Sequence, residues 1–193
     1  MQVGPQIRAA RSERGWSLRH LAGRAQVSPS LLSEVERGSA NPSITTLFQI
    51  AGALELPVQT LLPPAPVKAA APSLSSPVSI VRQAERPHIK LDGNIAWERL
   101  APHADGEVEC LELIYAPGAT SGETMFHHAG REWGVVLAGE LTLDLAFARH
   151  TLRTGDSVSF VSSTPHRLSN LGSETLRLLW NTINYSTPAT VPA

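Results

Sequence analysis

A proline-rich segment divides the chain and limits what it can fold into. Residues 63–77 contain five prolines, four alanines and three serines. Such a segment offers few side chains for burial, and its prolines disfavour both a helix interior and a central strand. We therefore expect an extended linker between a first domain over residues 1–62 and a second over residues 78–193. The alternative, a loop inside one domain, would be unusually long.

The composition narrows the class of protein. The chain has 193 residues, of which 42% are apolar, so two small domains can each bury a core. Its one cysteine, Cys110, cannot form an intrachain disulfide, and the N-terminus shows no apolar signal segment. No apolar run approaches the roughly 18–20 residues of a membrane helix. We expect a cytoplasmic protein with no membrane partner.

Short helices with clear boundaries are expected in the first domain. Serines stand where three of them would begin, and a serine hydroxyl can accept from the free amides of a helix N-terminus. The expected helices are one ending before Gly15, one over residues 18–25, one over residues 29–37 and one from about Ser43 to Pro57, followed by a final turn or helix over residues 58–62.

Two of these helices have the arrangement of a helix-turn-helix. Residues 18–25 and 29–37 are joined by a three-residue turn, and the second helix begins at a Ser-Pro pair. Leu32 and Val35 are apolar where this helix must pack inward. Its other face carries polar groups that can approach base edges in the major groove of DNA. These groups are Ser30, Ser33, Glu34 and Arg37.

The first domain resembles the Xre-type, phage-repressor-like helix-turn-helix family. The resemblance rests on residues 17–22, 27–38, 41–43 and 47–54. It implies an all-α, five-helix domain whose third helix enters the major groove of double-stranded operator DNA. It also implies DNA contacts from Ser28, from Pro29, Ser30, Ser33 and Glu34 toward bases, and from Arg19 and Arg37 toward phosphates. The alternative is a small helical bundle used for protein contact.

One position departs from the family pattern. Gln26 stands at the turn where the family usually has glycine. Glutamine can adopt the left-handed backbone conformation at a modest cost, so the turn is still expected to form.

The charge of the chain is divided between its two parts. The net charge of −1 would argue against a DNA-binding protein if it were spread evenly. Residues 1–62, however, hold six arginines against four glutamates, whereas residues 63–193 hold ten basic against thirteen acidic residues. The first domain therefore carries +2, which predicts weak non-specific DNA binding with a shallow salt dependence.

Beyond the linker the pattern changes to one of short strands. Apolar and polar residues alternate over residues 108–115, 140–145 and 157–160, and glycine or proline separates these runs. Many short strands at this spacing indicate a β-sandwich or barrel.

Two histidines and a glutamate could meet within this barrel. A turn at Ala129 and Gly130 would bring Glu132 beside His128, and a second strand would add His166. Two imidazoles and one carboxylate suit one divalent Zn, Fe, Ni or Mn ion. The alternative is a metal-free pocket in which these groups hydrogen-bond a ligand or one another.

The second domain resembles the cupin family. In the first cupin motif the matching positions are Phe126, His128, Glu132 and Gly139, and in the second they are Gly155, Pro165, His166 and Asn170. The resemblance implies an all-β double-stranded β-helix, or jelly-roll barrel. Phe126 takes the place of the first metal-binding histidine, and a phenyl ring cannot coordinate a metal. A strand slip or bulge that turns His127 inward would replace it.

Further pocket residues follow from strand parity. Val158 and Phe160 share a face with Asp156, and Leu168 and Asn170 share one with His166. We expect them, together with Phe126, to line the ligand pocket, with a core role as the alternative for the apolar ones. Three tryptophans are expected to serve in packing. These are Trp97, Trp133 and Trp180.

The two resemblances together imply a one-component bacterial transcriptional regulator. We expect a homodimeric repressor, not an enzyme, in which the barrel binds a small polar effector and supplies the dimer contact. A ligand that binds two dimer arrangements differently would then shift their populations and the operator affinity. The alternatives are a metal-dependent cupin enzyme, such as a dioxygenase or isomerase with an accessory DNA-binding domain, and a DNA-bound scaffold.

Overall fold

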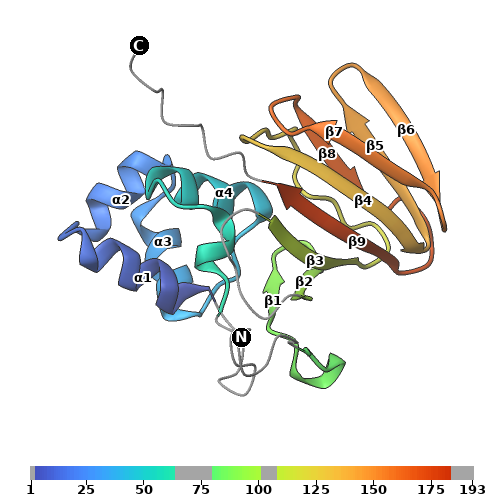
Figure 1. Cartoon of the computed structure of the whole chain (residues 1–193). Coiled ribbons are helices and arrows are strands. Elements are labelled where there is room, and N and C mark those ends of the chain that lie inside the picture. Colours follow the sequence, from blue (N-terminus) through green and yellow to red (C-terminus); the bar gives the residue numbers. More distant parts are fainter. Residues whose placement is uncertain (1–2, 64–79, 101–107, 184–193) are drawn as a thin grey trace, which may run out of the picture.

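The chain folds into a helical domain followed by a domain of two antiparallel sheets (Figure 1). The structure, a computed structural model, describes residues 3–63, 80–100 and 108–183. The expected linker over residues 63–77 lies outside the described residues apart from Pro63. In the part of the chain that is described, no helix has the length and hydropathy required to cross a bilayer.

The helical domain contains helices α1 to α4, and serines begin three of them. The helices are α1 (Gly4–Glu13), α2 (Leu18–Ala25), α3 (Pro29–Arg37) and α4 (Ile44–Ala53). The hydroxyls of Ser17, Ser28 and Ser43 each accept from the backbone amide three residues onward at 3.1 Å. These caps supply acceptors to amides that have no partner within the helix, which is why the expected starts are correct.

The expected count of five α-helices is too high by one, because the last element of the domain is a 3-10 helix. Residues 3–63 hold four α-helices, and Val58–Leu61 is a 3-10 helix, η1. Pro57 removes an amide donor at its start, and four residues are too few for an α-helix of ordinary length.

The helical domain has an apolar core. Helix α4 packs against α2, and the fully buried side chains between the helices include Leu21, Leu32, Leu47 and Ile50. The turn that joins α2 to α3 ends with Val27, whose amide donates to Ala22 O at 3.0 Å.

The second domain holds a six-stranded and a three-stranded sheet. The larger has the order β1-β2-β3-β9-β4-β7 and the smaller β6-β5-β8. All named strand pairs are antiparallel. A 3-10 turn, η2 (Gln83–Glu85), precedes them. The strands are β1 (His88–Leu91), β2 (Ile95–Arg99), β3 (Val108–Tyr115), β4 (Arg131–Ala138), β5 (Glu140–Leu145), β6 (Ala148–Arg153), β7 (Ser157–Val161), β8 (His166–Ser169) and β9 (Leu176–Ile183).

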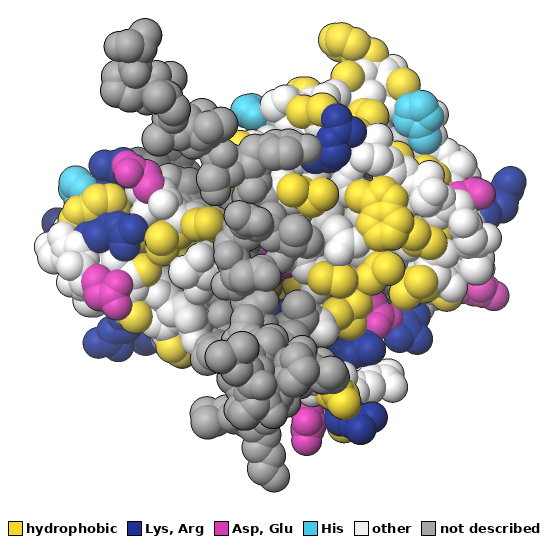
Figure 2. Space-filling view, viewed as in Figure 1, with side chains coloured by type: hydrophobic (Ala, Val, Ile, Leu, Met, Phe, Trp, Pro, Cys, Tyr) yellow, Lys and Arg dark blue, Asp and Glu magenta, His cyan; other side chains and the backbone are white. Residues whose placement is uncertain are grey.

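The inner faces of the sheets are mostly apolar, and the predicted alternation is present on β3. Leu111, Leu113 and Tyr115 are all buried. Trp97 and Trp180 are buried as expected for packing residues, whereas Trp133 is 40% exposed. Trp133 lies opposite Ser159 on β7 and faces outward, and Figure 2 shows apolar side chains spread over the surface of the sheets.

The two domains touch along α4. The backbone amide of Asp92 donates to Pro42 O at 3.0 Å, and Arg99 Nη1 donates to Pro63 O at 3.3 Å. The ring of Phe48 on α4 contacts aromatic side chains of the second domain. Figure 1 shows α4 on the side of the helical domain that faces the strands.

Candidate functional site

Helix α3 presents the polar face that the sequence predicted. Ser30 and Arg37 are exposed, and Ser33 and Glu34 are half-buried. The side chains are paired along the helix, since Ser30 Oγ donates to Glu34 Oε1 at 3.5 Å and Arg37 donates to Ser33 Oγ. Pro29 and Arg19 are also exposed. Part of this face is therefore open to solvent.

Two arginines of the helical domain are engaged within it. Arg11 pairs with the buried Glu36, and Arg14 donates to the carbonyl oxygens of Ala10 and Leu54 at 2.9 and 2.7 Å. Their guanidinium groups hold the domain together, so part of its positive charge is already used inside the protein.

The turn at Gln26 has the left-handed backbone that was expected. Gln26 has φ 55° and ψ 36°, and its amide donates to carbonyls in the last turn of α2. The residue thereby closes α2 in a conformation that glycine adopts at less cost.

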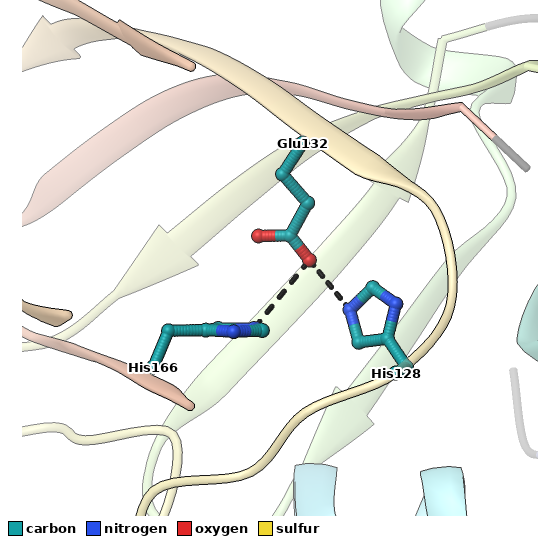
Figure 3. Close-up of side chains that lie close together, drawn as sticks. All are labelled: His128, Glu132 and His166. Atoms are coloured by element: carbon teal, nitrogen blue, oxygen red, sulfur yellow. Dashed lines mark hydrogen bonds and ion pairs between the residues drawn. The ribbon is translucent and has the colours of Figure 1, made fainter. Parts of the chain in front are cut away.

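In the second domain, His128, Glu132 and His166 lie together in space (Figure 3). His128 precedes β4, Glu132 is on β4 and His166 is on β8. His128 Nε2–H donates to Glu132 Oε1 at 2.6 Å, and His166 Nε2 lies 3.6 Å from the same oxygen. Potential ligand atoms of the three residues lie within 4.8 Å of one another.

The backbone around the group accounts for this convergence. Gly130 has φ 108°, a conformation that side chains disfavour, and turns the chain between His128 and Glu132. The amide of His128 donates to Ser162 O, and Phe126 forms a two-way backbone bridge with His166. The loop that carries His128 is thus fixed to β8 and the chain before it.

The group is buried and its hydrogen bonding is incomplete. The side chain of His166 is 0% exposed and that of Glu132 is 5% exposed. His166 Nδ1 donates to Thr164 O at 2.8 Å, which leaves Nε2 with a lone pair. Among the described residues, neither His166 Nε2 nor Glu132 Oε2 has a hydrogen-bond partner. Two neighbouring buried residues therefore each keep an acceptor without a donor, an arrangement that favours a cation or a hydrogen-bond donor beside them.

The two imidazoles have opposite titration behaviour. Burial lowers the pKa of His128, but the hydrogen bond to Glu132 and the negative charge of that carboxylate outweigh it, so the pKa lies above its usual value. Burial dominates at His166 and lowers its pKa below the usual value, although the charge of Glu132 opposes this. His166 is therefore neutral near pH 7, the form that offers a lone pair.

Neither Phe126 nor His127 supplies a further ligand atom to this group. The ring of Phe126 lies 4.4 Å from that of His166, beside the group but unable to coordinate. His127 is exposed, so the slip that would turn it inward does not occur.

The remaining residues that were expected to line the pocket do not all do so. Phe126 and Leu168 line a cavity next to Glu132. Phe160 packs against the ring of His166 at 5.0 Å, and Val158 is partly buried against the core. The expected pocket role of Asn170 is replaced by a structural one, because its amide nitrogen donates to two carbonyls, Tyr115 O at 3.0 Å and Glu174 O at 2.8 Å.

Sequence reasoning missed Phe48, which the structure places at the site. Its ring stacks on that of His128, with centroids 4.6 Å apart and planes 11° apart. The signal was present in α4, because the helix has a continuous apolar face formed by Leu47, Ile50 and Leu54, and Phe48 is a large apolar residue outside it.

Comparison with known families agrees with this division. Residues 7–61 match the family model described as Helix-turn-helix, and residues 111–181 match the one described as Cupin domain. The two matches fall on the helical domain and on the sheets.

Relatives combine both parts in one chain. The HTH-type transcriptional regulator SutR of Escherichia coli (strain K12) is 29% identical over 172 residues, 88% of each chain. The HTH-type transcriptional regulator PuuR of the same organism is 27% identical over 186 residues, 91% of each chain. The crystal structure of an HTH_3 family transcriptional regulator from Vibrio cholerae has a TM-score of 0.67 at 25% identity, covering 95% of this chain and 96% of that one. The chain therefore joins a helix-turn-helix domain to a cupin domain, and it is similar over most of its length to HTH-type transcriptional regulators.

Proposed function

We propose that this regulator is a one-component repressor that binds operator DNA through α3 and a small polar effector in the cupin barrel. The observation that carries the proposal is the buried group of His128, Glu132 and His166 in a chain whose other domain is a helix-turn-helix. A buried group with unpartnered acceptors is a place for a ligand, and the exposed face of α3 is a place for DNA.

One divalent metal ion fits the same three residues. Zn, Fe, Ni or Mn would be held by His128, Glu132 and His166, whose nitrogen and carboxylate donors suit these ions. The unpartnered acceptors of Glu132 and His166 support the assignment. A bound metal would supply positive charge and open coordination positions for a polar group of the effector.

We propose that the regulator acts as a homodimer and has no catalytic role. A single helix-turn-helix reads only a few base pairs, and two half-sites about 34–36 Å apart multiply specificity. The relatives SutR and PuuR, which align over most of their length, are both named as transcriptional regulators, which supports a regulatory role for this barrel. The competing hypothesis is that the barrel is a metal-dependent dioxygenase or isomerase.

The DNA-binding part is tested with the full chain and the DNA upstream of its own gene. Fluorescence anisotropy over a range of salt concentrations should show binding that weakens as salt rises, together with a dimer by light scattering. Absence of binding to any DNA from the genomic neighbourhood at low salt would overturn the repressor assignment.

The barrel is tested by elemental analysis and by mass spectrometry of what co-purifies with the protein. His166→Ala should lose metal or ligand, whereas His150→Ala, at an exposed position on β6, should retain it. Equal retention in both variants contradicts the assigned site. Turnover of a panel of small metabolites by the metal-loaded wild type would favour the enzyme instead.

A further inference from the structure

The barrel is sealed by a residue of the DNA-binding domain. Besides stacking on His128, the ring of Phe48 lies 5.3 Å from that of Phe126 and 6.5 Å from that of Trp97. Ile44, one helical turn earlier on α4, and Val58 of η1 line the same inner cavity. Residues of the helical domain therefore form part of the wall of the cupin pocket.

Phe48 and its neighbours separate two cavities. The inner one, next to Glu132, has a volume of about 30 Å³. The outer one lies between the domains, has a volume of about 240 Å³ and is lined by Phe48, Gly52 and Pro57 on one side and by His128 and Thr182 on the other. Phe48, Val58 and Thr182 line both cavities, and the ring of Phe48 stacks on that of His128, which lines the outer one.

The sizes of the cavities decide what each can hold. A water molecule needs a cavity of about 10–15 Å³, so the inner cavity has room for an ion or about two waters. Sites for small organic molecules are typically about 300–1,000 Å³. With the ring of Phe48 in place, the space beside Glu132 is therefore too small for a metabolite.

Helix α4 connects this seal to the core of the DNA-binding domain. Leu47 and Ile50 are fully buried within the helical domain, while Phe48 is turned to the barrel. Residues 47 and 48 point in directions about 100° apart on a helix, so one rigid element contacts both cores. The domains are also joined by the hydrogen bond from the Asp92 amide to Pro42 O.

We propose that the effector pocket is shared between the two domains, with the barrel group as its floor and Phe48 of α4 as its lid. An organic effector enters by displacing Phe48, and the displacement moves α4 and with it the DNA-binding domain. The regulatory meaning of this device rests on the function proposed above. The lid itself does not rest on that function, because it can be tested on the purified full chain without DNA.

The lid is tested through the chemical accessibility of His166 in the full-length protein after treatment with a chelator, because a metal on His166 would itself block the reagent. Diethyl pyrocarbonate acylates unprotonated imidazole nitrogens, and His166 is 0% exposed whereas His150 is exposed and provides an internal reference. At fixed pH, we expect Phe48→Ala to raise the rate of His166 modification, measured by mass spectrometry, by about tenfold relative to His150. Phe147→Ala is the matched control, since Phe147 is fully exposed on the hairpin between β5 and β6, and it should leave the rate unchanged.

The second readout is DNA affinity. Phe48→Ala should change the affinity for the operator by about threefold or more, because α4 loses its anchor on the barrel, whereas Phe147→Ala should not. If Phe48→Ala does not fold, as judged by circular dichroism, Phe48→Leu, which keeps part of the bulk, is used and should give a smaller increase in His166 modification.

The outcomes separate this inference from the proposed function. A His166 rate in the Phe48 variant within about twofold of the wild type would overturn the lid. An open barrel with unchanged DNA affinity would overturn the coupling to α4. A wild type that binds no DNA would refute the repressor while the protection of His166 could still be measured.

Discussion

Arg11 and Glu36 form a two-pronged ion pair that ties α1 to α3. Arg11 Nε and Nη2 donate to the two carboxylate oxygens at 2.6 and 2.7 Å, and Arg11 Nη1 donates to Trp16 O at 2.9 Å. The two side chains are 14% and 5% exposed. Helix α3, which we propose to read DNA, is therefore held from behind by a largely buried charge pair.

Glu36→Gln should destabilise the helical domain by about 3 kcal/mol, because it leaves the charge of Arg11 buried without its counter-ion. The free energy of unfolding, measured by urea denaturation followed by circular dichroism near 222 nm, checks this. Glu55→Gln is the control: Glu55 pairs with Arg24 but its side chain is 77% exposed, so its loss should stay below about 1 kcal/mol. Equal losses would show that the Arg11 pair is not special.

Gln26→Gly should stabilise the helical domain by about 0.5 kcal/mol. The left-handed backbone at φ 55° costs a non-glycine residue about 1–2 kcal/mol, and the greater freedom of glycine in the unfolded chain offsets part of the gain. Gln49→Gly, at an exposed position within α4, should instead lose about 1 kcal/mol. Thermal unfolding of the two variants should shift in opposite directions; a shift in the same direction contradicts the assigned backbone.

Gly134→Ala should destabilise the cupin domain by about 2 kcal/mol or more. A Cβ atom at residue 134 would lie 2.0 Å from Cε3 of Trp180, so the indole would have to move within a packed core. Trp180 fluorescence and the urea midpoint report the change. Gly23→Ala on α2, where a new Cβ meets nothing within 4 Å, should be neutral or stabilising. A Gly134 variant as stable as the wild type would refute this packing.

Changes on α3 should separate base recognition from phosphate contact. Ser30→Ala or Ser33→Ala should alter sequence preference among operator variants, whereas Arg19→Ala should weaken all sequences similarly and reduce the salt slope by about 1. Anisotropy titrations on a set of single-base operator variants distinguish the two patterns. The same response from both classes of variant would mean that α3 is not the reading helix.

Local signals explain how far the sequence predicts the helical domain. The boundaries of α2 and α3 follow from Ser17, Ser28 and Gly38, since caps act over only a few residues. The fifth helix is absent because the family pattern sets the path of the chain but not the hydrogen bonding of the four residues after Pro57.

Long-range contacts mark where prediction from sequence ends. The grouping of His128, Glu132 and His166 was expected because two motifs constrain their places in the fold. The partner of Phe48 was not, because it lies in another domain about 80 residues along the chain and no periodicity encodes such a contact. Asn170 likewise has a polar side chain, and one of its two carbonyl partners, Tyr115 O, is 55 residues away along the chain.

The contact between the domains uses α4 and leaves Ser30 and Arg37 on α3 exposed. In the function proposed above, an effector would therefore not need to cover α3 in order to weaken DNA binding. In the proposed homodimer, a small tilt of α4 would be magnified over the distance to the DNA and would shift the two α3 helices out of register with successive major grooves, about 34 Å apart. This mechanism would act through the relative orientation of the two DNA-binding domains, and it predicts that the effector does not change binding to a single half-site.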